Sequence, residues 1–469
     1  MKKLFTFILA LLAIVRIWAQ TFTVDNLKYE ITDETTRTAK LIGYETEPTG
    51  ILNIPSTISI KNIEYSVTSI GNMAFTNCIF LTQATIPNSV INIGDVIFFN
   101  CSALTQISVD NENPAYSSID GVLFNKDKTT LIKFPEGKTT PTYTIPHSVT
   151  HIEHGGLRNC SALKEIIITK NVNSIYDEGF LLCLALTQIT VENENAVYCS
   201  ENGILFNKNK TTLIQFPVSK IATVYEIPNS VTNIGTFAFD GCKFLTQVTI
   251  PISVTNIGMN AFARCPKLTQ INVDSENTTF CSENGILFNK DKTTLIQYPI
   301  GKKDSVYTIP NSVINIGANA FSNNIALTQI IISKNVENIE FYAFSGCTAL
   351  KEMTVWAITP PYIQMQSLGN FNYDIPVYVP EESLEKYKIA VGWNELNNLK
   401  AISSTALHTT SMPKSISVCN GILCNPQSLS LRIYDMQGHL IYNGNNSTVY
   451  LSAGIYVVKC LGTSYKVMF

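Results

Sequence analysis

One group of histidines has the residue types and spacing of a metal site. His147, His151 and His154 stand beside Glu153, and spacings of four and three residues could place two imidazoles on one helical face, as a zinc site needs. His147 and His151 take places that later copies of the same segment fill with asparagine, so drift at exposed positions is the simpler interpretation. The sequence therefore predicts no metal ion and no other cofactor.

Nucleophilic catalysis has little support either. A Ser–His–Asp triad needs a positioned base, and the two remaining histidines, His408 and His439, lie in the C-terminal tail. The sequence contains no G-x-S-x-G, H-E-x-x-H, phosphate-loop or dinucleotide-binding pattern. We expect a protein that is not an enzyme, and keep an exported enzyme or inhibitor only as a third hypothesis.

Seven of the twelve cysteines recur at one position of a repeated pattern, eleven residues after a recurring valine. Such thiols could form disulfides or bind a metal ion. Their period is that of the repeat, however, and Asn324 fills the eighth place, which favours a structural ladder that satisfies neighbouring backbone groups. The seven residues are Cys78, Cys101, Cys160, Cys183, Cys242, Cys265 and Cys347.

The recurring valine marks a repeat with an unbroken register. Successive markers are separated alternately by 23 and 59 residues, so a double unit of 82 residues occurs four times. This regularity indicates duplication and predicts a solenoid of eight units over residues 67–357, the last double unit lacking its insert. The markers are Val67, Val90, Val149, Val172, Val231, Val254, Val313 and Val336.

Each unit has the apolar phases of one coil. Isoleucine follows the marker by three residues, phenylalanine or leucine by eight and leucine by fourteen, before a short alternating strand. One unit cannot enclose a core, so burial between stacked neighbours and pairing of successive strands must stabilise the array. We predict an α/β fold, a leucine-rich repeat solenoid with a parallel β-sheet on one side and short helical turns on the other.

Each 59-residue unit carries an insert of 36 residues. Two apolar runs flank a polar turn such as N-K-D-K-T, which is typical of a β-hairpin, and a further short strand follows near Tyr143. The hairpins are expected at 121–135, 203–217 and 285–299.

The composition describes a large folded chain with little net charge. Of 469 residues, 45% are hydrophobic and 15% charged, and the net charge of −3 argues against a nucleic-acid-binding surface. Residues 1–19 have the pattern of a secretory signal peptide, because Lys2 and Lys3 precede an apolar run over 4–15 that is too short to span a membrane. We expect cleavage after Ala19, export, and no membrane-spanning segment in the mature chain.

The motifs of the repeat resemble those of a known family. The pattern I-P-x-S-V-x-x-I-G-x-x-A-F-x-x-C-x-x-L, the hairpin L-F-N-K-D-K-T-T-L-I-x-Y-P and the ending at 377–402 are similar to the BspA-like bacterial leucine-rich repeat family over residues 22–402. We assign an N-terminal cap to 20–66 and a C-terminal cap to 358–402. The resemblance implies a cell-surface or secreted binding protein of the adhesin type. Leu157 and Glu340 depart from the pattern, which we interpret as local sequence divergence within the same fold.

A polar linker over 403–412 leads to a small all-β module at 413–469, expected to be a sandwich. Its segments I-Y-D-M-Q-G at 433–438, L-S-A-G-I-Y-V-V-K at 451–459 and Y-K-V-M-F at 465–469 resemble the type A sorting domain of the type IX secretion system. The resemblance implies recognition by that outer-membrane machinery, removal of the domain, and release or attachment to surface lipopolysaccharide. An ordinary terminal β-domain is the alternative. The sorting residues implied are Gly438, Gly454, Ile455, Tyr456 and Lys466.

The expected binding surface is the outward face of the parallel sheet. Glutamine and threonine recur two and four residues after the strand leucine, a ladder suited to hydrogen bonding with an extended protein or a glycan. The same side chains could simply keep an exposed sheet soluble by pairing across strands, and both interpretations stay open. The candidate contacts are Gln83, Gln106, Gln188, Gln247, Thr249, Gln270, Asn272, Gln329 and Trp356.

Trp356, at the end of the last strand, is either a binding anchor or, as we favour, part of the packing against a Pro360–Pro361 cap. The expected partners are host matrix proteins, glycans or other bacterial surfaces, together with the type IX secretion machinery. A structural surface-layer or matrix component without a specific ligand is the alternative function.

Overall fold

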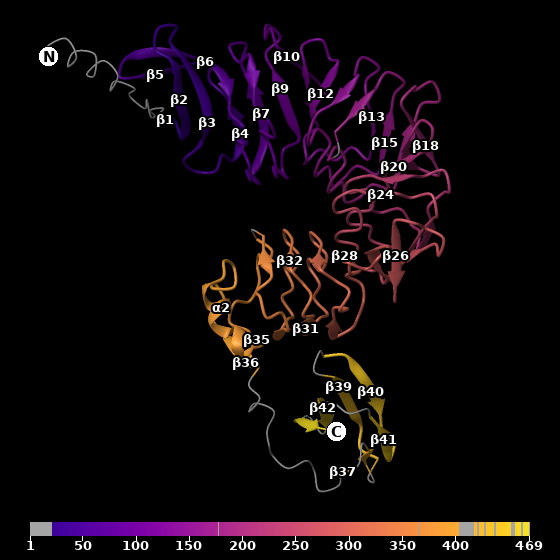
Figure 1. Cartoon of the computed structure of the whole chain (residues 1–469). Coiled ribbons are helices and arrows are strands. Elements are labelled where there is room, and N and C mark those ends of the chain that lie inside the picture. The colour runs from indigo at the N-terminus through magenta and orange to yellow at the C-terminus, as the bar shows by residue number, and fades with distance from the viewer. Residues whose placement is uncertain are drawn as a thin grey trace, which may run out of the picture. The chain divides into compact units, whose positions relative to one another are not determined.

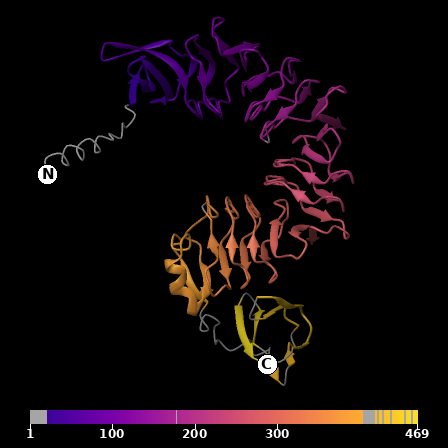
Figure 2. The ribbon, with the colours of Figure 1, turned by 45° about the horizontal axis from the view of Figure 1, so that its top comes forward.

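Short strands joined by turns make up almost all of the described chain in the computed structural model (Figure 1, Figure 2). The structure describes residues 21–176, 178–364 and 366–402, and, further on, 417–419, 422–425, 428–435, 438–451, 455–460 and 463–468. The expected signal peptide, the expected linker and Gly454 lie outside these residues. The chain divides into two units, Met1–Lys220 with Gly235–Phe239 and Ile221–Ile234 with Asp240–Phe469.

One strand of each coil lies in a parallel sheet, which confirms the predicted solenoid. In the strand Gln247–Ile250, Val248 and Ile250 are buried while Gln247 and Thr249 are partly exposed. The next strand pairs in register, with Gln270 opposite Gln247. In the first unit these sheets are β4 (Gly50–Asn53), β7 (Leu81–Ile86) and β9 (Gln106–Val109), and β13 (Thr142–Thr144), β15 (Glu165–Ile168) and β17 (Gln188–Val191). In the second unit they are β21 (Val224–Glu226), β23 (Gln247–Ile250) and β25 (Gln270–Val273), and β29 (Val306–Thr308), β31 (Gln329–Ile332), β33 (Glu352–Val355), β35 (Val377–Pro380) and β36 (Leu399–Ile402).

The return side of each coil is a two-residue strand followed by tight turns, where the sequence led us to expect short helical turns. In the coil that starts at Val313, for example, Asn319 and Asn323 both have φ near +60° (58° and 59°). Two left-handed residues in one coil, as here, turn the chain more sharply than a helix does, and asparagine tolerates that conformation best after glycine. The short strands are β8 (Asn92–Ile93), β14 (His151–Ile152), β16 (Ser174–Ile175), β22 (Asn233–Ile234), β24 (Asn256–Ile257), β30 (Asn315–Ile316), β32 (Asn338–Ile339) and β34 (Tyr362–Ile363).

Each insert forms the expected hairpin and then closes an additional, irregular coil. The third strand of the first insert pairs in parallel with β14, with Leu131 opposite Ile152. In the third insert Tyr298 stacks on Phe321, with ring centroids 5.1 Å apart. The inserts therefore share the core of the solenoid. Their strands are β10 (Tyr116–Ile119), β11 (Val122–Asn125) and β12 (Thr130–Lys133); β18 (Tyr198–Glu201), β19 (Ile204–Asn207) and β20 (Thr212–Gln215); and β26 (Phe280–Glu283), β27 (Ile286–Asn289) and β28 (Thr294–Gln297).

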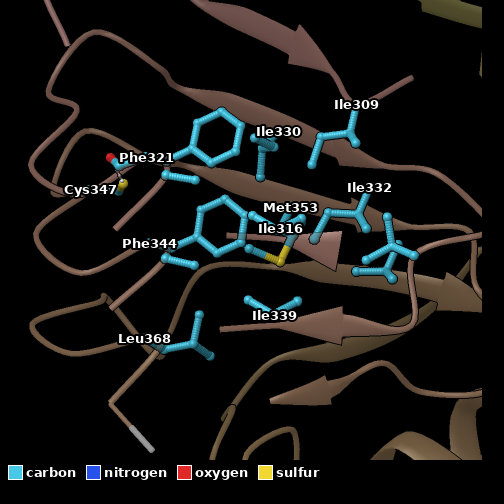
Figure 3. Close-up of a cluster of buried hydrophobic side chains, with 14 of the residues drawn as sticks. Ile309, Ile316, Phe321, Ile330, Ile332, Ile339, Phe344, Cys347, Met353 and Leu368 are labelled. Carbon is cyan, nitrogen blue, oxygen red and sulfur yellow. Dashed lines mark hydrogen bonds between the residues drawn. The ribbon is translucent and has the colours of Figure 1, made fainter. Parts of the chain in front are cut away.

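The core is built from the repeated apolar phases. Phe321 and Phe344 stack 5.1 Å apart, and Ile316 pairs with Ile339 on the neighbouring coil (Figure 3). Phe75 and Phe98 stack in the same way in the first unit, at 5.5 Å. Because each regular coil adds a phenylalanine at this position, or Leu157 in one coil, apolar burial continues from coil to coil.

A mixed sheet at one end and a short helical segment at the other bound the solenoid. At the N-terminal end, β1 (Thr21–Val24), β2 (Leu27–Asp33), β3 (Thr38–Tyr44), β5 (Thr57–Ile60) and β6 (Ile63–Ile70) form one sheet, which β8 joins through β6. At the other end, η1 (Glu381–Ser383) and α2 (Leu384–Ile389) lie between β35 and β36. The fully buried Trp393 closes this end, and its indole N–H donates to the Pro361 carbonyl at 2.7 Å.

The C-terminal module contains two antiparallel sheets, as expected of a small all-β sandwich. Tyr456 is buried in it, Gly438 has φ +85°, and Ile455 and Lys466 lie in strands. Its strands are β37 (Ser417–Cys419), β38 (Ile422–Cys424) and β41 (Thr448–Tyr450), and β39 (Leu431–Asp435), β40 (Leu440–Gly444), β42 (Ile455–Cys460) and β43 (Thr463–Met468). Within the described residues, no helix is long and apolar enough to cross a bilayer.

Candidate binding surface

The predicted glutamine ladder lies on the outward face of the parallel sheets. Gln83 stands opposite Gln106 in the first unit, and Gln247 opposite Gln270 in the second. Thr249 and Asn272 form the next rung beside the latter pair. All these side chains are partly or fully exposed, so the face presents neutral hydrogen-bonding groups at the spacing of adjacent strands, about 4.8 Å.

The amides of this ladder differ in whether the protein already uses them. Gln188 donates to Glu165 Oε1 at 3.2 Å and to Thr190 Oγ1 at 3.0 Å, and Gln106 donates to Ser108 Oγ at 2.9 Å. Among the described residues, the side chains of Gln247 and Gln270 have no hydrogen-bond partner. Cross-strand pairing therefore accounts for Gln188, while the two amides on β23 and β25 are free to bind a ligand.

The hairpins interrupt this face, which the sequence did not reveal. The turn between β26 and β27 reaches back to β25, where the Gly285 carbonyl accepts a hydrogen bond from the Ile271 amide at 2.9 Å. A Cβ at Gly285 would lie 2.9 Å from the Gln270 Cα, and the backbone there has φ +76°. The exposed amides are consequently grouped in short sheets, each flanked by a hairpin turn.

The lysines of the hairpin turns serve the hairpins themselves. Lys208 donates to the carbonyl of Asn193 at 3.0 Å, and Lys126 and Lys290 make the equivalent bonds in the other inserts. These ammonium groups stabilise loop carbonyls, so they contribute less to a charged docking surface than their number suggests.

A second set of structural residues went unnoticed in the sequence. Three asparagines, 82 residues apart, are fully buried, and each side-chain amide bonds at least four backbone groups. Their recurrence at the period of the double repeat was the available signal. They are Asn113, Asn195 and Asn277.

The cysteines of the predicted ladder are buried between coils. Cys101 Sγ lies 3.0 Å from the Phe75 carbonyl, and Cys347 Sγ lies 3.1 Å from that of Phe321. Burial raises the pKa of the Cys347 thiol to about 12. In Cys101 the neighbouring Cys78 thiol raises the pKa most, followed by burial. At neutral pH the Cys101 and Cys347 thiols are protonated and donate to the preceding coil.

The histidine cluster is dispersed over different partners. His147 Nε2 lies 3.0 Å from Glu192 Oε1, and His154 Nε2 lies 3.3 Å from Glu178 Oε2. The ring of His151 contacts Thr150 Oγ1 at 2.7 Å. Each imidazole therefore has its own neighbour, and the described residues bring no three His, Cys, Asp or Glu side chains into a metal-binding group.

Trp356 is half-buried and lines a groove together with Pro360, next to the C-terminal cap. The tryptophan that seals the cap is Trp393, through its bond to the Pro361 carbonyl. The packing of Trp356 against the proline segment stays a prediction, and part of the indole lies at the surface.

Known proteins are similar to this chain. Solved structures similar to it include the following three. A leucine rich cell surface protein from Faecalibacterium prausnitzii A2-165 is 24% identical, with 72% of this chain and 94% of that chain covered and a TM-score of 0.37. A leucine-rich repeat protein from Eubacterium ventriosum is 21% identical, with coverages of 75% and 94% and a TM-score of 0.40. The pneumococcal vaccine antigen PcpA is 17% identical, with coverages of 82% and 99% and a TM-score of 0.36. No curated protein matches the chain.

The repeats match one family directly. The profile of the BspA type leucine rich repeat region matches at residues 55–142, 137–226, 218–290 and 304–374, in six copies. These ranges cover more than half of the sequence and coincide with the stacked coils and their inserts. The chain therefore belongs to the BspA type leucine rich repeat family.

Proposed function

We propose that this protein is exported to the cell surface or released, and that it binds proteins or glycans of a host or of other bacteria without catalysing a reaction. The observation that carries the proposal is the pair of free amides at Gln247 and Gln270, in register on β23 and β25. An extended ligand laid across the strands would meet a donor and an acceptor on each.

The charge of the surface supports a ligand recognised by hydrogen bonds. The net charge is −3, and several lysines already bond loop carbonyls. Long-range electrostatic steering is consequently weak, and affinity has to come from short-range contacts.

A structural surface component is the second candidate. The bonds that join Gln188, Glu165 and Thr190 support it, since they show a part of the ladder satisfied within the protein. If the whole face behaved in this way, the polar ladder would only keep the sheet soluble.

The test is binding of the purified full chain to matrix proteins, glycans and bacterial surfaces, with the triple variant Gln247→Ala/Gln270→Ala/Gln329→Ala. Saturable binding that the triple variant weakens about tenfold, or ~1.4 kcal/mol, supports the proposal. The double variant Asn233→Ala/Asn256→Ala, on the opposite short strands, is the control and should bind like the wild type. Absence of binding by a folded chain would favour the structural role.

Export and sorting form a separate part of the proposal. The apolar run behind Lys2 and Lys3 and the all-β module at 413–469 support secretion followed by type IX sorting. Removal of residues 413–469 should leave the protein in the periplasm of a type IX-competent host, as measured by fractionation and surface proteolysis. Unchanged surface delivery would contradict the sorting role.

A further inference from the structure

A groove lies where the last regular coils meet the C-terminal cap. It encloses about 890 Å³ within the second unit, in the range of small-molecule sites. Aromatic, aliphatic and amide side chains line it together, including Trp356, Ile358, Tyr362, Asn311 and Asn338.

The apolar wall of this groove is a departure from the repeat. Trp356 and Ile358 stand 23 residues after Ser333 and Asn335, and Tyr362 pairs with Asn338. Three polar positions of one coil thus become aromatic or aliphatic in the next.

Capping of the solenoid does not explain these side chains. Ile358 is 53% exposed and Tyr362 is 62% exposed, whereas the residues that seal the end, such as Trp393 and Tyr387, are fully buried. Exposed apolar groups grouped around a groove indicate a binding site more often than chance exposure does.

The polar wall is made of neutral amides. Asn335 donates to the Asn311 carbonyl at 2.8 Å, and Asn338 donates to Asn315 Oδ1 at 2.8 Å. Asn311 Oδ1 is shielded from solvent and accepts no hydrogen bond from any described residue. A ligand hydroxyl can supply that bond after a small movement of the side chain. The charged residues at the groove, Lys334 and Glu337, have opposite signs.

We infer that the groove binds a neutral saccharide. A sugar ring presents C–H faces, which pack on exposed aromatic rings, and edges of hydroxyls, which bond amides. A groove lined by both Tyr362 and Asn311 offers both kinds of contact, and the balance of Lys334 and Glu337 disfavours a strongly anionic sugar. The inference rests on the proposed binding function but places the ligand away from β23 and β25.

The test uses the full chain and short neutral oligosaccharides of hexose and N-acetylhexosamine, measured by calorimetry. Sialylated and sulfated oligosaccharides and a proline-rich peptide serve as competing ligand classes. Tyr362→Ala should weaken neutral-saccharide binding about fivefold or more, and Tyr362→Phe should leave it within about twofold, because the ring supplies the contact. Ile358→Ser should also weaken binding. The matched control Ile325→Ser, at a residue 70% exposed and outside the groove lining, should bind like the wild type.

Each other outcome overturns the inference. If the folded chain binds no neutral saccharide, or binds only the charged sugars or the peptide, the groove is not a neutral-saccharide site. Saccharide binding that is lost in the Gln247→Ala/Gln270→Ala/Gln329→Ala variant but kept in Tyr362→Ala would refute the groove and uphold the sheet face. A chain that binds matrix proteins but no saccharide keeps its proposed function and loses this site.

Discussion

Asn195 offers the sharpest test of how the inserts are held on the solenoid. Its side chain is buried, and the amide nitrogen donates to the carbonyls of Thr169 and Val172 at 2.9 and 2.8 Å. Its oxygen accepts from the amides of Val197 and Tyr198 at 2.9 and 2.7 Å. One side chain thereby ties the start of the second insert to the coil before it.

Asn195→Ala would leave four backbone groups without these partners. Each buried group that stays unsatisfied costs about 1–3 kcal/mol. Water entering the space vacated by the amide recovers a part, so we expect a loss of about 4 kcal/mol, near the low end of the sum. That is a large fraction of a typical domain's stability of about 5–15 kcal/mol.

Urea denaturation gives the free energy of unfolding, and hydrogen exchange reports whether β18 and β19 open locally first. Repeat arrays can unfold in segments, so both measurements are needed. Asn193→Ala, at an exposed asparagine two residues away, is the matched control and should stay within about 0.5 kcal/mol of the wild type. An Asn195→Ala protein with wild-type stability and wild-type exchange at β18 would refute the reasoning.

Three other perturbations test the packing. Lys133→Gln removes the ion-pair partner of the buried Glu136, 2.8 Å away, and should lower the free energy of unfolding in urea by about 3–5 kcal/mol. The double variant Lys133→Gln/Glu136→Val has the residues of the second insert at these two positions and should recover most of that loss. A double variant no more stable than the single one would contradict this expectation. Gly285→Ala should cost about 2 kcal/mol and Gly50→Ala, with a positive φ but open space, about 1; equal losses would show that crowding is unimportant. Burial raises the pKa of Cys347 from its ordinary value of 9.0 to about 12 in the folded chain, so its contribution to stability is full below pH 9 and is lost as the pH rises toward 12. Plotted against pH, the free energies of unfolding of the wild type and of Cys347→Ala should converge between pH 9 and 12. A constant difference between the two would contradict the raised pKa.

The solenoid could be predicted because the same pattern of apolar residues occurs eight times in the sequence. Ile316 and Ile339, or Phe321 and Phe344, occupy equal phases 23 residues apart, and stacking is the arrangement that buries both. Random drift at one copy, such as Leu157, does not disturb that signal.

The extra coils within the inserts could not be predicted in the same way. Tyr298 ends an apolar run that is typical of a hairpin strand, and its stacking partner, Phe321, belongs to the next coil. In the sequence, the buried Asn277 likewise resembles an ordinary loop residue. The carbonyls that its side chain bonds belong to Pro251 and Val254, 26 and 23 residues earlier, so its role is not visible in the local sequence. Local patterns do not carry such contacts.

The candidate surface was predicted as a set of residues but without its internal differences. Gln188 and Gln270 follow the same local pattern. The cross-strand neighbour of Gln188 is Glu165, whereas the cross-strand neighbour of Gln270 is Gln247. The Glu165 carboxylate accepts a hydrogen bond from the Gln188 amide. Which amides remain free is decided by the cross-strand neighbour, which becomes known only with the register.

In a chain built by duplication, some residues differ from the repeat pattern. Their burial distinguishes those that stabilise the fold from those that are able to bind a ligand. Glu136 breaks the repeat, but it is buried and paired with Lys133, so it belongs to the packing of the first insert. His147 breaks the repeat at an exposed position, and its imidazole is already engaged by Glu192 at 3.0 Å. Tyr362 pairs with a repeat asparagine, Asn338, is largely exposed, and lines a groove together with amide side chains. Exposure without an internal role is the condition that a ligand-binding residue must meet, and among these three departures from the repeat it is met by Tyr362.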